Sequence, residues 1–73
     1  MIYCIMVFSS VTYALKAQGI LAKEGFGTRL EKLNKDQTLK GCGYGLRIEK
    51  SKLSDASRIM KREKIRVVEV IDY

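Results

Sequence analysis

The 73-residue chain contains no histidine, and this absence removes several classes of site. A cysteine nucleophile in a protease-like or transferase-like site needs a neighbouring general base, so Cys-His catalysis is excluded. Two cysteines without histidine give no zinc-ligand spacing, and the carboxylates are not clustered along the sequence. The sequence therefore predicts no metal, no cofactor and a protein that is not an enzyme.

The chain also has too few cysteines for a disulfide framework and no apolar run long enough to cross a membrane. Cys4 lies in an apolar run and Cys42 lies among glycines, and such different settings are not typical of paired cysteines in secreted proteins. The longest apolar run, Ile2–Phe8, is far shorter than the ~20 residues of a membrane span, and no export signal is recognisable. We expect a cytoplasmic protein with no membrane attachment.

The net charge of +6 comes from 14 lysines and arginines against 8 acidic residues, scattered along the chain. Scattered cations are typical of a solvated basic surface, although they also attract nucleic acid non-specifically. The segment 40–44 is a poor match to the RNA-recognition pattern, because Cys42 occupies the first aromatic position. Nucleic acid therefore ranks last among the expected partners.

Residues 1–73 have the length of a single domain, and their hydrophobic patterns predict four strands and two helices. The first helix is expected to begin after the caps Ser9 and Ser10 and to end at Gly25, and the second to begin at Ser51. Gly19 is expected to let the first helix lie close to the sheet. The predicted strands are 2–8, a peripheral strand in 26–33, 46–49 and 66–71. The predicted apolar helix stripes are Val11, Ala14, Leu15, Gln18, Leu21 and Ala22, then Leu53, Ala56, Ile59 and Met60.

The order β-α-β-β-α-β at this length predicts the ferredoxin-like α+β fold. In that arrangement two helices cover one face of a four-stranded antiparallel sheet, and the first and third strands are central. The start of the third strand then lies near the Ser9-Ser10 turn, where the first strand gives way to its helix. Two stretches far apart in the sequence are thus expected to share a site.

The segment 40–47 is the candidate site, because it combines three glycines with a cysteine and two flanking cations. Alternating glycines at 41, 43 and 45 indicate backbone with positive φ or a close approach by another part of the chain. A reactive Cys42 would gain accessibility from these glycines and positive potential from Lys40 and Arg47. Alternatively, Cys42 is a small structural residue beneath a glycine turn.

The remaining cysteine and the arginine have simpler interpretations. Cys4 is expected to pack in the core, and a Cys4–Cys42 disulfide would require both residues to reach the same strand end. The alternation of Leu46 and Ile48 directs Arg47 toward the face without helices. There it would hold an anion or, more commonly, pair with an acid such as Glu49 or Glu69.

Two motifs resemble the family of small selenium/sulfur carrier-like proteins. The first is Phe8-Ser9-Ser10 opening a helix, and the second is Cys-Gly-x-small-Leu-Arg, matched by Cys42, Gly43, Gly45, Leu46 and Arg47. The resemblance implies that Cys42 carries sulfur or selenium as a persulfide or perselenide between donor and acceptor proteins. Arg47, Lys40, Ser9 and Ser10 would then stabilise its anion. Similar proteins have a proline- and arginine-containing segment before the cysteine, whereas this chain has no proline.

An interpretation from another class is a small dimeric regulatory or protein-interaction module with a structural Cys42. Tyr3, Ile5 and Val7 are expected to expose apolar area on the face without helices, which a homodimer would cover. Replacing Cys42 would leave this function intact and would abolish carriage.

Overall fold

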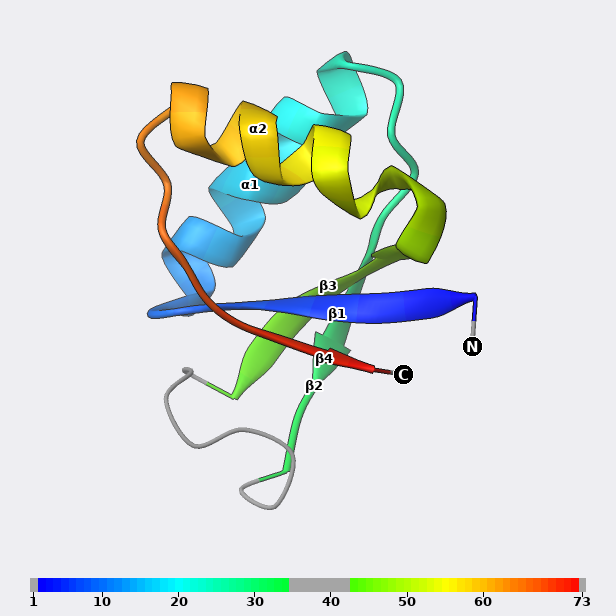
Figure 1. Ribbon diagram of the computed structural model, residues 1–73. Coiled ribbons are helices and arrows are strands. Elements are labelled where there is room, and N and C mark those ends of the chain that lie inside the picture. The colour runs from blue at the N-terminus through cyan, green and yellow to red at the C-terminus, as the bar shows by residue number, and fades with distance from the viewer. Residues whose placement is uncertain (1, 35–42, 73) are drawn as a thin grey trace.

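The computed structural model describes residues 2–34 and 43–72 and has the ferredoxin-like architecture that the sequence predicts. The sheet order is β2-β3-β1-β4 with antiparallel neighbours throughout, so β1 and β3 are central. Both helices cover one face of the sheet, and the described ends of the chain lie on the same side (Figure 1). The elements are β1 (Tyr3–Phe8), α1 (Val11–Lys23), β2 (Arg29–Lys32), β3 (Tyr44–Glu49), α2 (Leu53–Arg62) and β4 (Val67–Asp72).

Helix α1 begins and ends where its capping residues predict. The Ser10 hydroxyl accepts a hydrogen bond from the Tyr13 backbone N–H at 3.2 Å. After the C-cap Glu24, Gly25 adopts a φ of +88°, which a glycine reaches without strain. Both predicted ends of this helix are confirmed.

The buried face of α1 matches the predicted stripe only in part: its members Ala14 and Leu21 are buried, and Ala17, outside the stripe, is buried with them. Ala14 and Ala17 lie fully buried on the sheet, whereas Val11 and Leu15 are 39% and 50% exposed. Both sets of residues recur at helical spacing, and the sheet selects the face whose small alanines allow close packing. Gly19 is exposed with no atom near its would-be Cβ, so the expectation that it brings the helix close to the sheet is wrong.

Helix α2 buries the predicted residues but begins differently. Its buried residues Ala56, Ile59 and Met60 confirm the predicted stripe. Ser51, however, lies within a single 3-10 turn, Lys50–Lys52, and the N-cap of α2 is Lys52 without a side-chain cap bond. The tighter turn carries the chain from β3 into α2, so Ser51 is not the cap.

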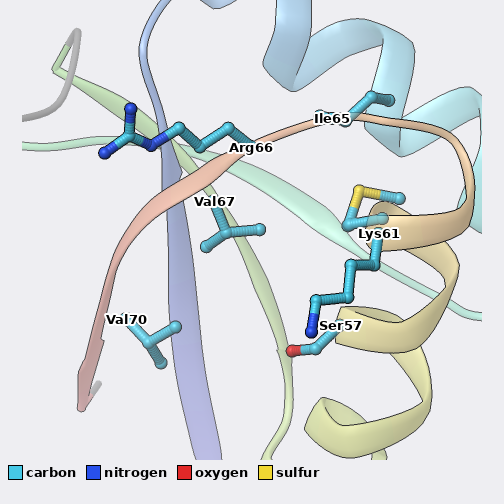
Figure 2. Close-up of a pocket in the computed structure, with 7 residues that line it drawn as sticks. Ser57, Lys61, Ile65, Arg66, Val67 and Val70 are labelled. Carbon is cyan, nitrogen blue, oxygen red and sulfur yellow. The ribbon is translucent and has the colours of Figure 1, made fainter.

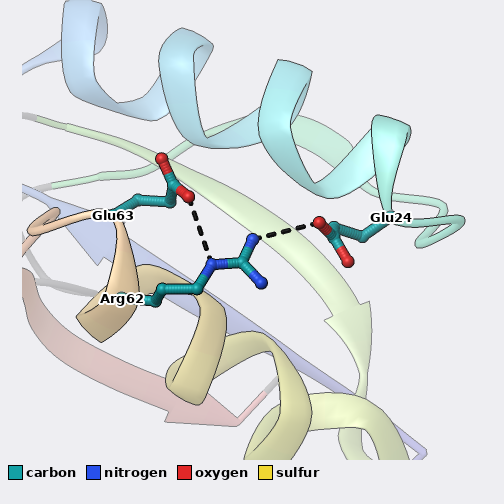
Figure 3. A network of polar contacts seen from close by, with 3 residues as sticks. All are labelled: Glu24, Arg62 and Glu63. Carbon is teal, nitrogen blue, oxygen red and sulfur yellow. Dashed lines mark hydrogen bonds and ion pairs between the residues drawn. The ribbon is translucent and has the colours of Figure 1, made fainter.

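The ends of the two helices are joined by one ion-pair network. Arg62, the last residue of α2, donates to the Glu24 carboxylate at 3.0 Å and to Glu63 at 3.2 Å (Figure 3). Because all three side chains are substantially exposed and screened by solvent, such pairs contribute little to the stability.

The sheet is buried on both faces at its centre. Cys4, Met6 and Phe8 pack beneath the helices, while Ile5 and Val7 point to the other face. That second face was expected to expose Ile5 and Val7, but they are only 1% and 0% exposed. Their described neighbours there are Leu33, after β2, and Val68 and Ile71 on β4. The expectation of exposed apolar area is therefore wrong for these two residues, since the chain itself covers them.

Two glycines of the 40–47 segment have the conformations that their spacing predicts. Gly43 has a φ of +90°, a backbone conformation that residues other than glycine rarely adopt. Gly45 faces β1 so closely that a Cβ would overlap the Ile5 side chain and lie 2.8 Å from the Met6 carbonyl oxygen. The start of β3 is thus shaped by positive φ at one glycine and by close approach at the next.

The substitution Gly45→Ala should destabilise the protein by about 1–3 kcal/mol, because β1 must move to admit the methyl group. For a domain of this size each kcal/mol lowers the melting temperature by roughly 4–8 °C, which thermal circular dichroism resolves. Gly19→Ala is the matched control: it adds the same methyl group at an open helical position and should stabilise by about 0.5–1 kcal/mol. Equal melting temperatures for the two variants would refute the close approach at Gly45.

Candidate functional site

The candidate site is the corner where the start of β3 meets the ends of β1 and β2. Gly45 pairs with Val7, two residues before the Ser9-Ser10 turn. On the other side, the Leu33 backbone N–H donates to the Gly43 carbonyl at 2.6 Å. We call Ser9, Ser10, Leu33, Gly43 and Gly45 the β1–β3 corner. The prediction that the start of the third strand lies near the first strand-to-helix turn is confirmed.

Three of the predicted site residues, Lys40, Gly41 and Cys42, lie outside the described residues. The structure instead defines the platform to which they are joined, because Gly43 is covalently bonded to Cys42. Positive φ at Gly43 and its short hydrogen bond to Leu33 fix the backbone directly after the cysteine. The corner therefore sets where the motif cysteine is attached to the sheet.

The two serines of the corner differ in their roles. The Ser10 hydroxyl oxygen already accepts a hydrogen bond from the Tyr13 backbone N–H. The same hydroxyl group can still donate its proton to an anion. Its backbone carbonyl accepts from the Ala14 N–H at 3.1 Å, as the helix requires. Ser9 is exposed. Of the first amides of α1, that of Tyr13 is bound by the Ser10 hydroxyl, whereas those of Val11 and Thr12 have no acceptor within the helix.

Arg47 lies on the face without helices, as the strand alternation predicts, and is held from both neighbouring strands. Its guanidinium carbon is 5.0 Å from the centre of the Tyr3 ring on β1. Its Nε lies 3.7 Å from Glu31 Oε2 on β2, and Arg29 Nε lies 3.8 Å from the same oxygen. The expected ion pair therefore exists with Glu31, and the opposite charge offsets part of the positive potential of both arginines.

Sequence reasoning missed Glu31, Arg29 and the stacking role of Tyr3. The antiparallel register places Arg29 directly opposite Arg47 and Glu31 opposite Gly45. Two like charges face each other there, and the shared carboxylate lies between them. The result is a shallow groove of about 250 Å³, whose lining includes Thr28 and both arginines. Only the strand pairing brings these charges together, and no local pattern in the sequence indicates it.

Cys4 is a core residue, as predicted. Its side chain is fully buried beneath the helices, and burial raises the pKa of the thiol; the charge of Lys50 lowers it and that of Asp72 raises it. Cys4 pairs with Ile48, at the opposite end of the central strands from Gly45. Gly43 adjoins that other end, and because Cys42 lies outside the described residues the expectation about a Cys4–Cys42 disulfide stays untested.

The fold and the corner define a small α+β domain. Its third strand begins between two conformationally required glycines, Gly43 and Gly45, and a cysteine directly precedes the first of them. Residues 3–72 match the family described as "Putative Se/S carrier protein-like", and the chain belongs to this family. No curated protein and no solved structure matches the chain. The resemblance seen in the motif thus extends over nearly the whole chain.

Two further observations bear on ligands and membranes. Within residues 2–34 and 43–72, no three histidine, cysteine or acidic side chains gather closely enough to hold a metal ion. Across the same ranges, neither helix has the length and apolar character needed to cross a bilayer.

The Cys4 thiol should be nearly inert in the folded protein, because it is buried and its pKa is raised. In a Cys42→Ser variant, where Cys4 is the remaining thiol, native alkylation by iodoacetamide should be roughly a hundredfold slower than in urea. Mass spectrometry at timed intervals measures both rates. Native alkylation as fast as in urea would mean that Cys4 is accessible and would contradict its place in the core.

Proposed function

We propose that the protein is a non-enzymatic carrier that holds sulfur or selenium on Cys42 and passes it from a donor protein to an acceptor protein. Membership of the Se/S carrier-like family supports this proposal, and so does the geometry beside the cysteine. The observation that carries it furthest is the fixed Gly43, whose positive φ and 2.6 Å hydrogen bond anchor the backbone directly after Cys42. An anchored backbone beside a thiol suits repeated docking by two partners.

The transfer needs only an ionised thiol and a donor persulfide. The Cys42 thiolate attacks the outer sulfur of the donor persulfide, so that a new S–S bond forms on Cys42. The donor S–S bond breaks, and the donor leaves as a thiolate. An acceptor thiolate later takes the outer sulfur in the same way, and Cys42 leaves as a thiolate. Each step exchanges one S–S bond for another, so no external oxidant or reductant is consumed.

The corner and its neighbours would stabilise the anions in these steps. A persulfide, like a thiolate, is stabilised by positive potential and by N–H donors. Arg47 and Lys40 would supply the charge, and the Ser9-Ser10 turn would supply donors from the start of α1. A cytoplasmic location fits this chemistry, because a reducing compartment keeps an unmodified thiol free.

Cysteine desulfurase with cysteine should add the mass of one sulfur atom to the protein, and Cys42→Ser should abolish the addition. The protein is reduced and freed of reductant before the incubation, and intact-mass spectrometry then measures the adduct directly. Cys4→Ala is the matched control and should retain it, since Cys4 is buried. An adduct that persists in the Cys42→Ser variant would refute the proposal. Complete absence of an adduct in the unchanged protein, together with slow alkylation of Cys42, would also refute it.

Removing the Arg47 charge should raise the pKa of the Cys42 thiol and slow its alkylation near neutral pH. For a partly screened charge we expect roughly a threefold lower rate in Arg47→Gln. Arg29→Gln, which removes the same charge at the position directly opposite on β2 but outside the motif, is the matched control. Glu31→Gln should act in the opposite direction, because it releases both arginines from their shared carboxylate. Identical pH-rate profiles for Arg47→Gln and Arg29→Gln would remove Arg47 from the site.

The alternative function, a dimeric interaction module with a structural Cys42, has less support. Its expected contact surface relied on Ile5 and Val7, which are buried within the chain. The Cys42→Ser experiment separates the two functions, because only the carrier requires the thiol.

A further inference from the structure

The large apolar side chains that remain exposed are concentrated at one end of α1. Five such residues occur in the described part of the chain, and three of them, Val11, Tyr13 and Leu15, lie within the first five residues of this helix. Each of the three is between 39% and 50% exposed. A single exposed apolar residue is ordinary on a protein surface, whereas a group of them indicates a contact surface. We call Val11, Tyr13 and Leu15 the α1 cluster.

The α1 cluster exists because the helix has more apolar surface than the sheet covers. The residues buried on the sheet include the small Ala14 and Ala17, which leaves larger side chains outside. Val11 and Leu15 are one helical turn apart and share a flank of the helix. Tyr13 is rotated from Val11 by about 200° and lies on the other flank. A protein lying across the first turns of α1 would therefore contact all three side chains.

The α1 cluster adjoins the β1–β3 corner. Val11 directly follows the Ser9-Ser10 turn, which belongs to the corner together with Gly43. Cys42 is joined to Gly43 by one peptide bond. A protein that exchanges sulfur with Cys42 must bring its own sulfur atom to this end of the molecule. Its surface then meets the first turns of α1.

The other two exposed large apolar residues lie away from the corner. Ile2 precedes β1 at the opposite end of the central strands, where its carbonyl accepts a hydrogen bond from the Lys50 backbone N–H at 2.8 Å. Val70 lines a groove of about 400 Å³ between α2 and β4 (Figure 2). In the sheet, β1 lies between the strand of Val70 and β3. These two positions therefore provide controls for the α1 cluster.

The charge around the α1 cluster is positive. Residues 1–23 contain two lysines, Lys16 and Lys23, and no acidic residue. Neither lysine forms an ion pair with another residue in the described part of the chain. The acids on the strands beside the corner, Glu31 and Glu69, belong to the face without helices. The α1 cluster thus combines exposed apolar side chains with an unpaired cation, Lys16.

We propose that the α1 cluster is the docking surface for the protein that donates sulfur to Cys42, and that the donor presents an apolar patch with acidic side chains at its rim. This inference rests on the proposed function, because it names the surface that the carrier's partner contacts. The cluster supplies the apolar contact, and Lys16 attracts the acids. A second copy of the chain fits less well, because its own α1 cluster would bring a second Lys16 and no acid from residues 1–23.

The test compares the loading of Cys42 by two sulfur sources in the full-length protein. Cysteine desulfurase with cysteine is a protein donor and has to dock. Sodium tetrasulfide needs no docking surface: the Cys42 thiolate attacks its terminal sulfur, one S–S bond forms as another breaks, and trisulfide leaves. Val11→Gln/Leu15→Gln should slow loading by the desulfurase roughly tenfold and leave loading by tetrasulfide unchanged. Intact-mass spectrometry at timed intervals measures both rates.

The matched control is Ile2→Gln/Val70→Gln, which makes the same kind of change at two exposed apolar positions away from the corner. The desulfurase should load it at the rate of the unchanged protein, and thermal melts verify that both double variants fold. Lys16→Glu should slow loading by the desulfurase roughly threefold, because it repels an acidic rim. Lys23→Glu makes the same change about 10 Å farther along α1 and should have less effect.

A competition experiment measures docking without sulfur transfer. Excess Cys42→Ser protein should slow loading of the unchanged protein by occupying the desulfurase, and adding Val11→Gln/Leu15→Gln to the competitor should remove this inhibition. Loading of Val11→Gln/Leu15→Gln at the unchanged rate would overturn the docking surface and leave carriage intact. Equal slowing in the control double variant, or loading by tetrasulfide alone, would also overturn it. A dimer in sedimentation that Val11→Gln/Leu15→Gln disrupts would assign the cluster to a second copy instead. Absence of loading from both sources would refute carriage itself.

Discussion

The structure depends on the burial of β1 on both faces. Residues 4–8 are each no more than 1% exposed, although successive side chains of a strand point to opposite sides. The helices bury one set, and Leu33 with two β4 residues packs against the other. Hydrogen bonding to β3 and β4 satisfies the backbone on both sides. Because neither face of β1 is exposed to solvent, the strand is tightly packed on both sides. The strands that pair with it are held by the same packing.

The candidate site inherits this rigidity through Gly45. The strand that contains Gly45 approaches β1 so closely that only glycine fits opposite Val7. Gly43, two residues earlier, adopts positive φ and bonds to Leu33. These constraints fix the peptide immediately after the motif cysteine, although neither glycine takes part in chemistry. The glycines of the motif are therefore explained by geometry, and the cysteine by the function we propose.

On the face of the sheet without helices, strand pairing changes the electrostatic surroundings of Arg47. In the sequence, Arg47 is a cation two positions after a glycine. In the sheet, it lies between Tyr3 and Glu31, and it shares that carboxylate with Arg29. Its positive potential is thus partly offset, and the β2 residues that offset it are far from the motif in sequence.

The sequence by itself determined the order of elements, the ferredoxin-like topology, the ends of α1 and the conformational demands at Gly43 and Gly45. Hydrophobic period, capping chemistry and glycine are local signals, so each can be detected without knowing the fold. Tertiary structure alone decided which stripe of α1 is buried, how Ile5 and Val7 are covered, where α2 begins and which acid meets Arg47. These features depend on strand register and on contacts between residues distant in sequence, and the free energy of packing, not local preference, selects among the alternatives.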